Sequence, residues 1–428
     1  MNDLPLAGIR IADFTWVWAG PYSTLLLSTM GAEVIKFESR KRLDLNRTIR
    51  PFAYADPTVH ANFVEWLGAG ALEGKPFAHG RPGPNQADHF NQLNMSKLGI
   101  TLDLSHPKSR NIIRSVVALS DVVIENYSPR VMKGLGLDYD ALREVRPDLI
   151  YLAMSGLGAV GPDRDFVLYG GAQVAIGGLS SLTGYIGGPP LTLPIGYGDP
   201  LAAMHAAFCI LAALEHRRVT GEGQYIDMSQ LESMINLIPE GMMEYLMNDR
   251  IPSRMGNRDA IMAPHDVFPC KGDDKWIAIA VGSEAEWRAL CSAMGNPAWT
   301  GLAVFADMYS RWQHQDTLGK YLGQWTANFE AYELMSLLQQ AGVAATPSLS
   351  NAEIVHDPHL WERNFFVNID HPATGPGIQP SPGIHLSETP AHFFRAPLLG
   401  EHNQRVFGEL LGITTDEIES LVEEKVIF

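Results

Sequence analysis

A glycine-rich segment in the first half of this sequence has the spacing of a nucleotide-binding loop. Gly156-Leu157-Gly158-Ala159-Val160-Gly161 reads GxGxxG and follows an apolar run that is typical of a strand. In a dinucleotide site such a loop opens a helix whose N-terminus binds the pyrophosphate. Here Pro162-Asp163-Arg164-Asp165 follows, and this segment predicts a turn instead. The spacing alone is weak evidence, and we do not expect a nicotinamide site.

A second segment that could carry chemistry is His356-Asp357-Pro358-His359, because imidazole and carboxylate groups are common metal ligands. No third ligand stands at a recognisable spacing, so we interpret the segment as a surface turn before a helix and expect no metal. The three cysteines, at positions 209, 270 and 291, also lack metal-ligand spacing. We interpret them as small buried side chains of a protein from a reducing compartment.

Short segments in a fixed order along nearly the whole chain carry a family resemblance. Typical examples are Asn94-Met95-Ser96-Lys97 and Glu125-Asn126-Tyr127-Ser128-Pro129. The other segments lie at 6–14, 19–21, 31–38, 101–104, 149–151, 155–156, 183–190, 198–200, 220–224, 342–347 and 357–359. Each is weak alone, but their order makes chance an unlikely source. The sequence resembles the family III CoA-transferases, the group of formyl-CoA transferase and carnitine CoA-transferase.

The resemblance implies a reaction and shows a gap in the residues that perform it. In the family a carboxylate attacks an acyl-CoA thioester, which gives a mixed anhydride and CoA thiolate, and CoA then passes through an enzyme thioester to an acceptor acid. The family's loop reads Thr-Gly-x-x-Asp-Gly-Pro-Pro, whereas this chain has Thr183-Gly184-Tyr185-Ile186-Gly187-Gly188-Pro189-Pro190. Gly187 occupies the position of the nucleophile. We therefore expect no catalytic nucleophile in this chain, and CoA or acyl-CoA as a substrate rather than as a tightly bound cofactor.

Other acids could replace the missing one. Asp199 matches an Asp that the family carries beside its separate nucleophile, so we interpret it as a cap of the helix that begins near Pro200. Asp163 and Asp165 have the sequence context of solvated turn residues. In the related racemases an Asp occupies the position that matches Gly170, which leaves that position empty as well.

The resemblance also implies a set of CoA contacts. Val17 and Trp18 would line the path of the adenine and pantetheine, Arg40 would approach the nucleotide, and Asn94 to Lys97 with Asn126 and Tyr127 would contact pantetheine and phosphates. Arg130 and Lys133 lie near Gly134, where relatives have an arginine, and they either bind phosphate or solvate a helix face. Trp18 could also be a core aromatic residue. Residues 255–265 replace the family's glycine-rich lid and are not glycine-rich here.

Composition limits the partners of the protein. The chain has 428 residues, is 46% hydrophobic, and can bury a large core in two or more domains. Its net charge of −16 disfavours nucleic acid or an anionic membrane as a partner, so an anionic ligand must meet a local basic cluster. The N-terminus lacks a signal-peptide pattern, and no uncharged stretch approaches the roughly 18 apolar residues of a membrane span. We expect a cytoplasmic protein.

The elements that must position these residues follow from hydrophobic periodicity. β-branched runs alternate with helical patterns, which is typical of parallel βαβ units. We expect strands at 9–14, 34–37, 122–125, 149–153 and 276–281. Helices are expected at 21–30, 109–119, 140–145, about 200–218, 229–246 and 285–294. Residues 41–92 have little periodicity, and we interpret them as a surface excursion or a segment that contacts a partner.

We predict an α/β protein with two domains. The large domain is Rossmann-like and is formed by both chain ends, with residues 1–200 as its first part and 331–428 as its return. Residues 200–225 form a linker helix, and 225–330 form a smaller middle α/β domain. The resemblance further implies an interlocked dimer, in which each chain threads through the hole of the other.

Three hypotheses for the function remain open at this point. The chain is the nucleophile-less subunit of a heteromeric CoA-transferase whose homologous partner carries the Asp, as in succinyl-CoA:benzylsuccinate CoA-transferase. Alternatively, it is a self-sufficient homodimeric transferase or isomerase that uses another acid. The third hypothesis is a non-enzymatic CoA-binding protein. The first is favoured, because only the acid is missing from an otherwise matching chain.

Overall fold

The computed structural model describes residues 4–48, 83–193 and 195–428. The chain divides into two compact units. The first contains residues 1–179, 192–240 and 362–428, and the second contains 180–191 and 241–361. Most of the expected excursion at 41–92 lies outside the described residues.

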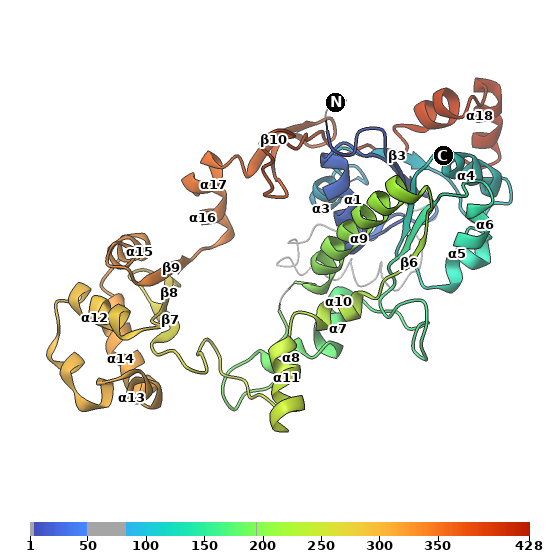
Figure 1. The fold of residues 1–428 in the computed structure, drawn as a ribbon. Helices are drawn as coiled ribbons and strands as arrows, with labels where there is room; N and C mark the ends of the chain where they lie inside the picture. The colour runs from blue at the N-terminus through green and yellow to red at the C-terminus, as the bar shows by residue number, and fades with distance from the viewer. Residues whose placement is uncertain (1–3, 49–82, 194) are drawn as a thin grey trace, which may run out of the picture. The chain divides into compact units, whose positions relative to one another are not determined.

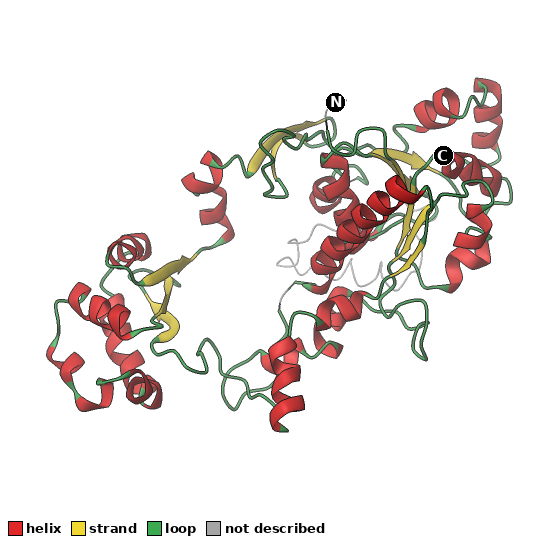
Figure 2. Ribbon diagram, viewed as in Figure 1, coloured by secondary structure: helices red, strands yellow, loops and turns green. Residues whose placement is uncertain are grey.

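A six-stranded parallel sheet forms the centre of the first unit (Figures 1 and 2). Its order is β3-β2-β1-β4-β5-β6, and every neighbouring pair is parallel. The strands are β1 (Arg10–Asp13), β2 (Glu33–Glu38), β3 (Leu98–Thr101), β4 (Val122–Glu125), β5 (Ile150–Ala153) and β6 (Tyr225–Asp227). Such strands are buried on both faces, which explains their continuous apolar runs. This sheet confirms the predicted parallel α/β class.

Helices cover both faces of this sheet. On one face α1 (Ala19–Thr29) and α9 (Gly198–Thr220) pack side by side (Figure 1). On the other face α4 (Ser109–Ala118), α5 (Arg130–Leu135) and α6 (Tyr139–Arg143) share a core with the C-terminal segment around Phe407 and Ile427. Shorter helices of this unit are η1 (Leu45–Arg47), α3 (Asp88–Leu93), α7 (Gly170–Ile176), α10 (Gln230–Ile235), η5 (Gln404–Leu410) and α18 (Thr415–Glu423). The antiparallel pair β10 (Phe366–His371) and β11 (Gly375–Pro380) also belongs to it.

The second unit is a smaller α/β body. Its sheet is antiparallel in the order β7 (His265–Pro269), β8 (Trp276–Ala280), β9 (Ala344–Ser348). Its helical segments include α12 (Glu284–Ala293), η3 (Ala298–Gly301), η4 (Ala303–Phe305), α13 (Met308–Gln313), α14 (Gln315–Thr326), α15 (Ala331–Gln340), α16 (Asn351–Val355) and α17 (Pro358–Glu362). Three helices span the boundaries of the units, α8 (Leu179–Leu182), α11 (Pro239–Asn248) and α17. A core that includes Phe268, Ile277 and Leu334 holds this unit together.

The bounds of the units differ from the expected 225–330. Residues 225–240 belong to the first unit because β6 pairs with β5. Residues 331–361 belong to the second because β9 pairs with β8 and because Leu334 and Leu338 of α15 are buried in its core. The single helix expected at 229–246 is wrong: α10 ends at Ile235 and α11 begins at Pro239. Proline has no N–H to donate and is suited to the first turn of a helix, so it starts a new one.

Among the described residues one helix, α9, is long and apolar enough to cross a membrane. Nearly half of its 18-residue apolar stretch is buried inside the protein, where Ala202, Ala206 and Ile210 pack against the parallel sheet. This is the environment of a core helix in an α/β layer.

Candidate functional site

The direction of the strand order reverses between β1 and β4, and this topological switch point is where open parallel sheets bind ligands. The loops that follow these two strands meet there. The backbone N–H of Trp16 donates to Asn126 Oδ1 at 2.8 Å, and Asn126 Nδ2 donates to the Trp16 carbonyl at 2.8 Å. The rings of Trp16 and Tyr127 contact edge to face at 5.8 Å between centroids. The structure therefore brings together four residues expected to contact CoA: Val17, Trp18, Asn126 and Tyr127.

The loop after β1 has an unusual backbone. Val17 has a φ of 65°, a left-handed conformation that is strained for a β-branched residue. Its N–H donates to Asp44 Oδ1 at 3.2 Å, and its carbonyl accepts a hydrogen bond from Asn46 Nδ2. The next residue, Trp18, places its ring edge to face with His89 at 5.2 Å. Strained backbone that neighbouring side chains hold in place is common at ligand sites.

A buried ionic network lies beneath this loop. Lys97 Nζ is 3.4 Å from Asp13 Oδ2 and donates to the Pro21 carbonyl and to Asn94 Oδ1, both at 2.9 Å. Lys36 Nζ donates to the Thr15 carbonyl at 2.7 Å and is 3.5 Å from Asp44 Oδ2. The side chains of all four ionic residues are essentially inaccessible. Thus Asn94 and Lys97 occupy the interior, with their polar groups engaged by protein.

Burial and neighbouring charges shift the pKa values of Lys97 and Asp13 in this network. Desolvation lowers the pKa of Lys97 to about 7, although the charge of Asp13 opposes the shift. Desolvation also acts to raise the pKa of Asp13, but the charges of Lys97 and Lys36 outweigh it, and the net pKa lies below its ordinary value. The two lysines and two aspartates are therefore interdependent, because removing one leaves its partner charged and buried.

A basic cluster borders the switch point. Arg40 and Arg42 are exposed on the segment after β2. The guanidinium of Arg42 lies 5.0 Å from the Trp16 ring centroid. Sequence reasoning missed Arg42, although the run Arg40-Lys41-Arg42 in an acidic chain was a signal for it. Arg130 and Lys133 are exposed on α5, and among the described residues neither forms an ion pair.

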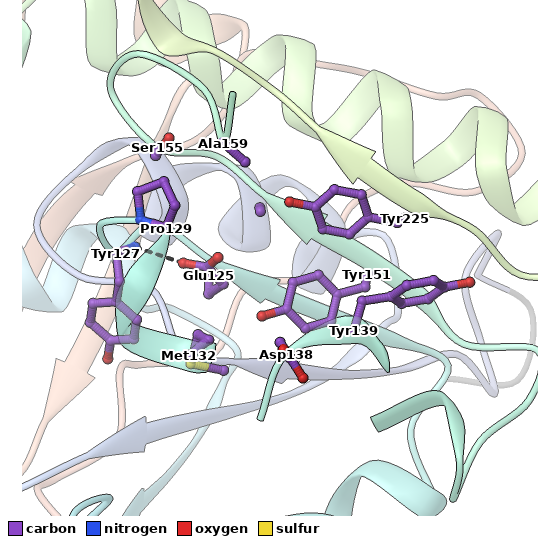
Figure 3. Close-up of a pocket in the computed structure, with 11 residues that line it drawn as sticks. Glu125, Tyr127, Pro129, Met132, Asp138, Tyr139, Tyr151, Ser155, Ala159 and Tyr225 are labelled. Carbon is purple, nitrogen blue, oxygen red and sulfur yellow. Dashed lines mark hydrogen bonds between the residues drawn. The ribbon is translucent and has the colours of Figure 1, made fainter. Parts of the chain in front are cut away.

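A cavity of about 60 Å³ lies beside Asn126, at the carboxyl ends of β4 and β5 (Figure 3). Its lining includes Glu125, Ser155 and the rings of Tyr127, Tyr139, Tyr151 and Tyr225. Glu125 Oε2 accepts a hydrogen bond from the Tyr127 N–H at 2.7 Å. Desolvation raises the pKa of Glu125 to about 8 against this hydrogen bond, and the nearby charge of Asp227 adds to the increase. Glu125 is therefore mostly a neutral acid at pH 7.

The loop that carries Gly187 lies in the second unit. Arg254 fixes it by donating from Nε and Nη2 to the Gly188 carbonyl at 3.1 and 2.9 Å and from Nη1 to the Ser181 carbonyl at 3.1 Å. Gly187 has a φ of 72°, and a Cβ added there would meet no atom within 4 Å. The loop is thus ordered by its neighbours, and a side chain added at Gly187 would point into open space.

Asp199 has a different environment from the one expected. Helix α9 begins at Gly198 without a side-chain cap, so the prediction that Asp199 caps it is wrong. The Asp199 carboxylate instead accepts a hydrogen bond from the N–H of Gly170, at the start of α7. A Cβ added to Gly170 would lie 2.3 Å from Asp199 Oδ2. The carboxylate fills the space that a side chain at 170 would need.

The GxGxxG segment and the His-Asp-Pro-His segment were expected to form turns, and both do. No helix opens at 156–161: Gly158 and Gly161 have φ of 83° and 99° in a turn, and the next helix is α7. His356 and Asp357 lie between α16 and α17, and Pro358 and His359 are the first residues of α17. Asp357 Oδ1 accepts a hydrogen bond from the Leu360 N–H at 3.0 Å. Among the described residues no group of three or more His, Cys, Asp or Glu side chains is arranged to hold a metal ion.

Comparison with known proteins shows the family of the chain. The family model described as "CoA-transferase family III" matches residues 6–403. The chain is 34% identical to succinyl-CoA:mesaconate CoA-transferase of Haloarcula hispanica, over 97% of this chain and 99% of that protein. It is 30% identical to the succinyl-CoA–L-malate CoA-transferase beta subunit of Chloroflexus aurantiacus, over 100% of this chain and 99% of that protein.

A solved structure shows the same fold. The crystal structure of a CAIB/BAIF family protein from Brucella suis superposes with a TM-score of 0.80 at 28% identity. The match covers 95% of this chain and 100% of that one.

Glu125→Gln tests the buried acid. Between its unfolded pKa of roughly 4.3 and about 8, the folded state holds a proton that the unfolded state has lost, so this group's contribution to stability falls as pH rises through that window. The glutamine side chain carries no titratable proton, so the variant does not lose stability as pH rises through this window. We expect equal stability near pH 5 and a gain on the order of a few kcal/mol near pH 9, measured by chemical denaturation. Glu222→Gln, at an exposed position, is the matched control, and equal pH profiles for Glu125→Gln and wild type would contradict the assignment.

Proposed function

Because the chain belongs to CoA-transferase family III, we propose that it transfers CoA from succinyl-CoA to a carboxylic acid and works as a subunit beside a homologous, Asp-bearing chain. The first part of this proposal, that the chain binds CoA and takes part in its transfer, rests on the switch-point site. Its tryptophan-lined loop and the exposed Arg40 and Arg42 offer aromatic surface and positive charge to an adenine nucleotide with phosphates. In a chain of net charge −16 such a basic cluster is unexpected, and the binding of an anionic ligand explains it.

The identity of the CoA donor rests on relatives. Two proteins similar to this chain over nearly their whole length are named for succinyl-CoA, with mesaconate and L-malate as their other substrates. Both of these acids carry two carboxylates. A dicarboxylic acid is therefore the acceptor class that we propose for this chain.

The second part of the proposal, that the chain works beside an Asp-bearing partner, rests on the glycine at position 187. The loop keeps its turn and its contacts with Arg254, but it offers no carboxylate to a thioester. A homologous partner with the Asp would supply one. Support comes from a relative named as a beta subunit. Exposed apolar side chains on α9, Met204, Phe208 and Leu211, further support a partner chain, because surfaces of this kind mark interfaces.

The contacts with CoA can be separated from the supporting network. Arg40→Ala should weaken CoA binding roughly 10- to 100-fold without loss of stability, because Arg40 is exposed and charged hydrogen bonds contribute about 1.5 to 3 kcal/mol. Lys97→Ala should instead lower the free energy of unfolding by about 3 to 5 kcal/mol, because it leaves Asp13 buried and unpaired.

Calorimetric titration with CoA and urea denaturation measure these two effects. Arg218→Ala is the control: it removes an exposed arginine at the C-terminal end of α9, which is the opposite edge of the sheet. Unchanged CoA binding in Arg40→Ala would remove Arg40 from the site.

The composition of the native assembly tests the partnership. Protein isolated from its source by a tag on this chain should contain a second, homologous chain in equal amount, as measured by native mass spectrometry. That complex should exchange CoA between succinyl-CoA and dicarboxylic acids at ordinary enzyme rates, on the order of 1 to 1000 per second. A fully active homodimer that contains this chain alone would refute the heteromer and leave the transferase assignment intact.

A further inference from the structure

We propose that Glu125 is a positioning residue for CoA binding: its buried carboxyl group holds the loop at 126–129 in the arrangement that receives the ligand. The proposal rests on the CoA-transferase function above and deepens it. Glu125 does not itself touch CoA. It acts through the backbone N–H of Tyr127, and the loop in turn fixes Asn126 and the start of α5.

The loop at 126–129 joins the end of β4 to the start of α5. It carries two residues that are expected to contact CoA, Asn126 and Tyr127, and it leads directly into Arg130, the first residue of α5. Asn126 exchanges two hydrogen bonds with Trp16 of the facing loop, both at 2.8 Å. The position of this short segment therefore sets the relative positions of the loop after β1, the loop after β4 and helix α5.

Glu125 joins this loop to the rigid sheet. It is the last residue of β4, where it lies opposite Ala153 of β5, and its carbonyl accepts a hydrogen bond from the Met154 N–H at 3.0 Å. The residue is 4% exposed, and its Oε2 accepts a hydrogen bond from the Tyr127 N–H at 2.7 Å. One buried side chain thus connects the backbone of the strand with the backbone of the loop.

Packing beneath the loop is incomplete, so it contributes little to the loop's position. The cavity of about 60 Å³ in Figure 3 is bordered by Glu125 and by the rings of Tyr127, Tyr139, Tyr151 and Tyr225. Side chains that border a void lack van der Waals contacts on that side. The hydroxyl of Tyr127 is buried and has no hydrogen-bond partner among the described residues. The hydrogen bond to Glu125 therefore supplies a directional contact where packing supplies little.

A glutamic acid is a costly residue for this position, which points to a use for its carboxyl group. Desolvation raises its pKa to about 8, the charge of Asp227 adds to the increase, and among the described residues no cation offsets it. The interaction that opposes the shift is the hydrogen bond from Tyr127. A methionine of similar shape would avoid the cost of burying an acid. What methionine lacks is a strong acceptor for the loop N–H.

Glu125→Met and Glu125→Gln separate positioning from stability. The glutamine amide oxygen can still accept the Tyr127 N–H, whereas methionine cannot. In calorimetric titration with CoA we expect Glu125→Met to bind roughly tenfold more weakly than wild type, since it lacks one hydrogen bond, and Glu125→Gln to restore the affinity. Urea denaturation should show no loss of stability in Glu125→Met, because the lost hydrogen bond is offset by removal of the buried acid.

Hydrogen exchange reports on the loop directly and requires no ligand. In Glu125→Met the Tyr127 amide should exchange faster, on the order of tenfold, and in Glu125→Gln it should exchange at the wild-type rate. Mass spectrometry of peptides that span 126–129 measures this. Glu222→Met, at an exposed position, is the matched control and should change neither CoA binding nor exchange in the loop.

The outcomes separate this proposal from the proposed function. If Glu125→Met binds CoA as wild type does, or its Tyr127 amide exchanges no faster, Glu125 does not position the loop and the transferase assignment stands. Weak binding together with a large loss of stability in Glu125→Met would make Glu125 a structural residue and contradict the proposal. If wild type itself binds no CoA, the proposed function fails, and the role of Glu125 in binding fails with it.

Discussion

The buried group of Asp13, Lys36, Asp44 and Lys97 is the constraint on which the switch-point site depends. Two cations and two anions without access to water are stable only if each has its partners in place. Those partners include the Pro21 and Thr15 carbonyls and, through Asp44, the N–H of Val17. The network thus fixes the end of β1, the start of α1 and the loop between them as one piece. Hydrophobic packing could not do so, because it does not choose a direction for a backbone N–H.

The rigid loop after β1 affects ligand binding. Val17 is held in a strained left-handed conformation, and Trp16 and Trp18 on either side of it remain partly accessible. Strain of this size, about 1 to 3 kcal/mol, persists only where the surroundings over-determine it. The loop is therefore arranged before any ligand binds, which lowers the ordering cost of binding. Lys97 and Asn94 support the site from behind, and Arg40, Arg42, Asn126 and Tyr127 border it.

The sequence predicted the parts of the structure that depend on local pattern. Strands at 122–125 and 149–153 and the helix at 109–119 were found to within one residue, because their apolar periodicity is strong and their ends carry turn residues. The break before Pro239 was missed because an apolar run continues across it. Arg42 was missed because its significance depends on Trp16, a contact formed in space. Likewise, the contact between Gly170 and Asp199 joins positions 29 residues apart, and no spacing rule describes it.

The two glycines at positions 170 and 187 show what a contact in space adds to residue identity. The sequence resemblance implies an Asp at the position of each, and the residue types alone do not tell the two positions apart. A Cβ added at Gly187 would meet no atom within 4 Å, so there is open space around that position. A Cβ added at Gly170 would lie 2.3 Å from Asp199 Oδ2, so a carboxylate from α9 already occupies that space. Two glycines that are alike in sequence therefore differ in their surroundings, because a residue without a Cβ either leaves room open or gives it to a side chain from another segment.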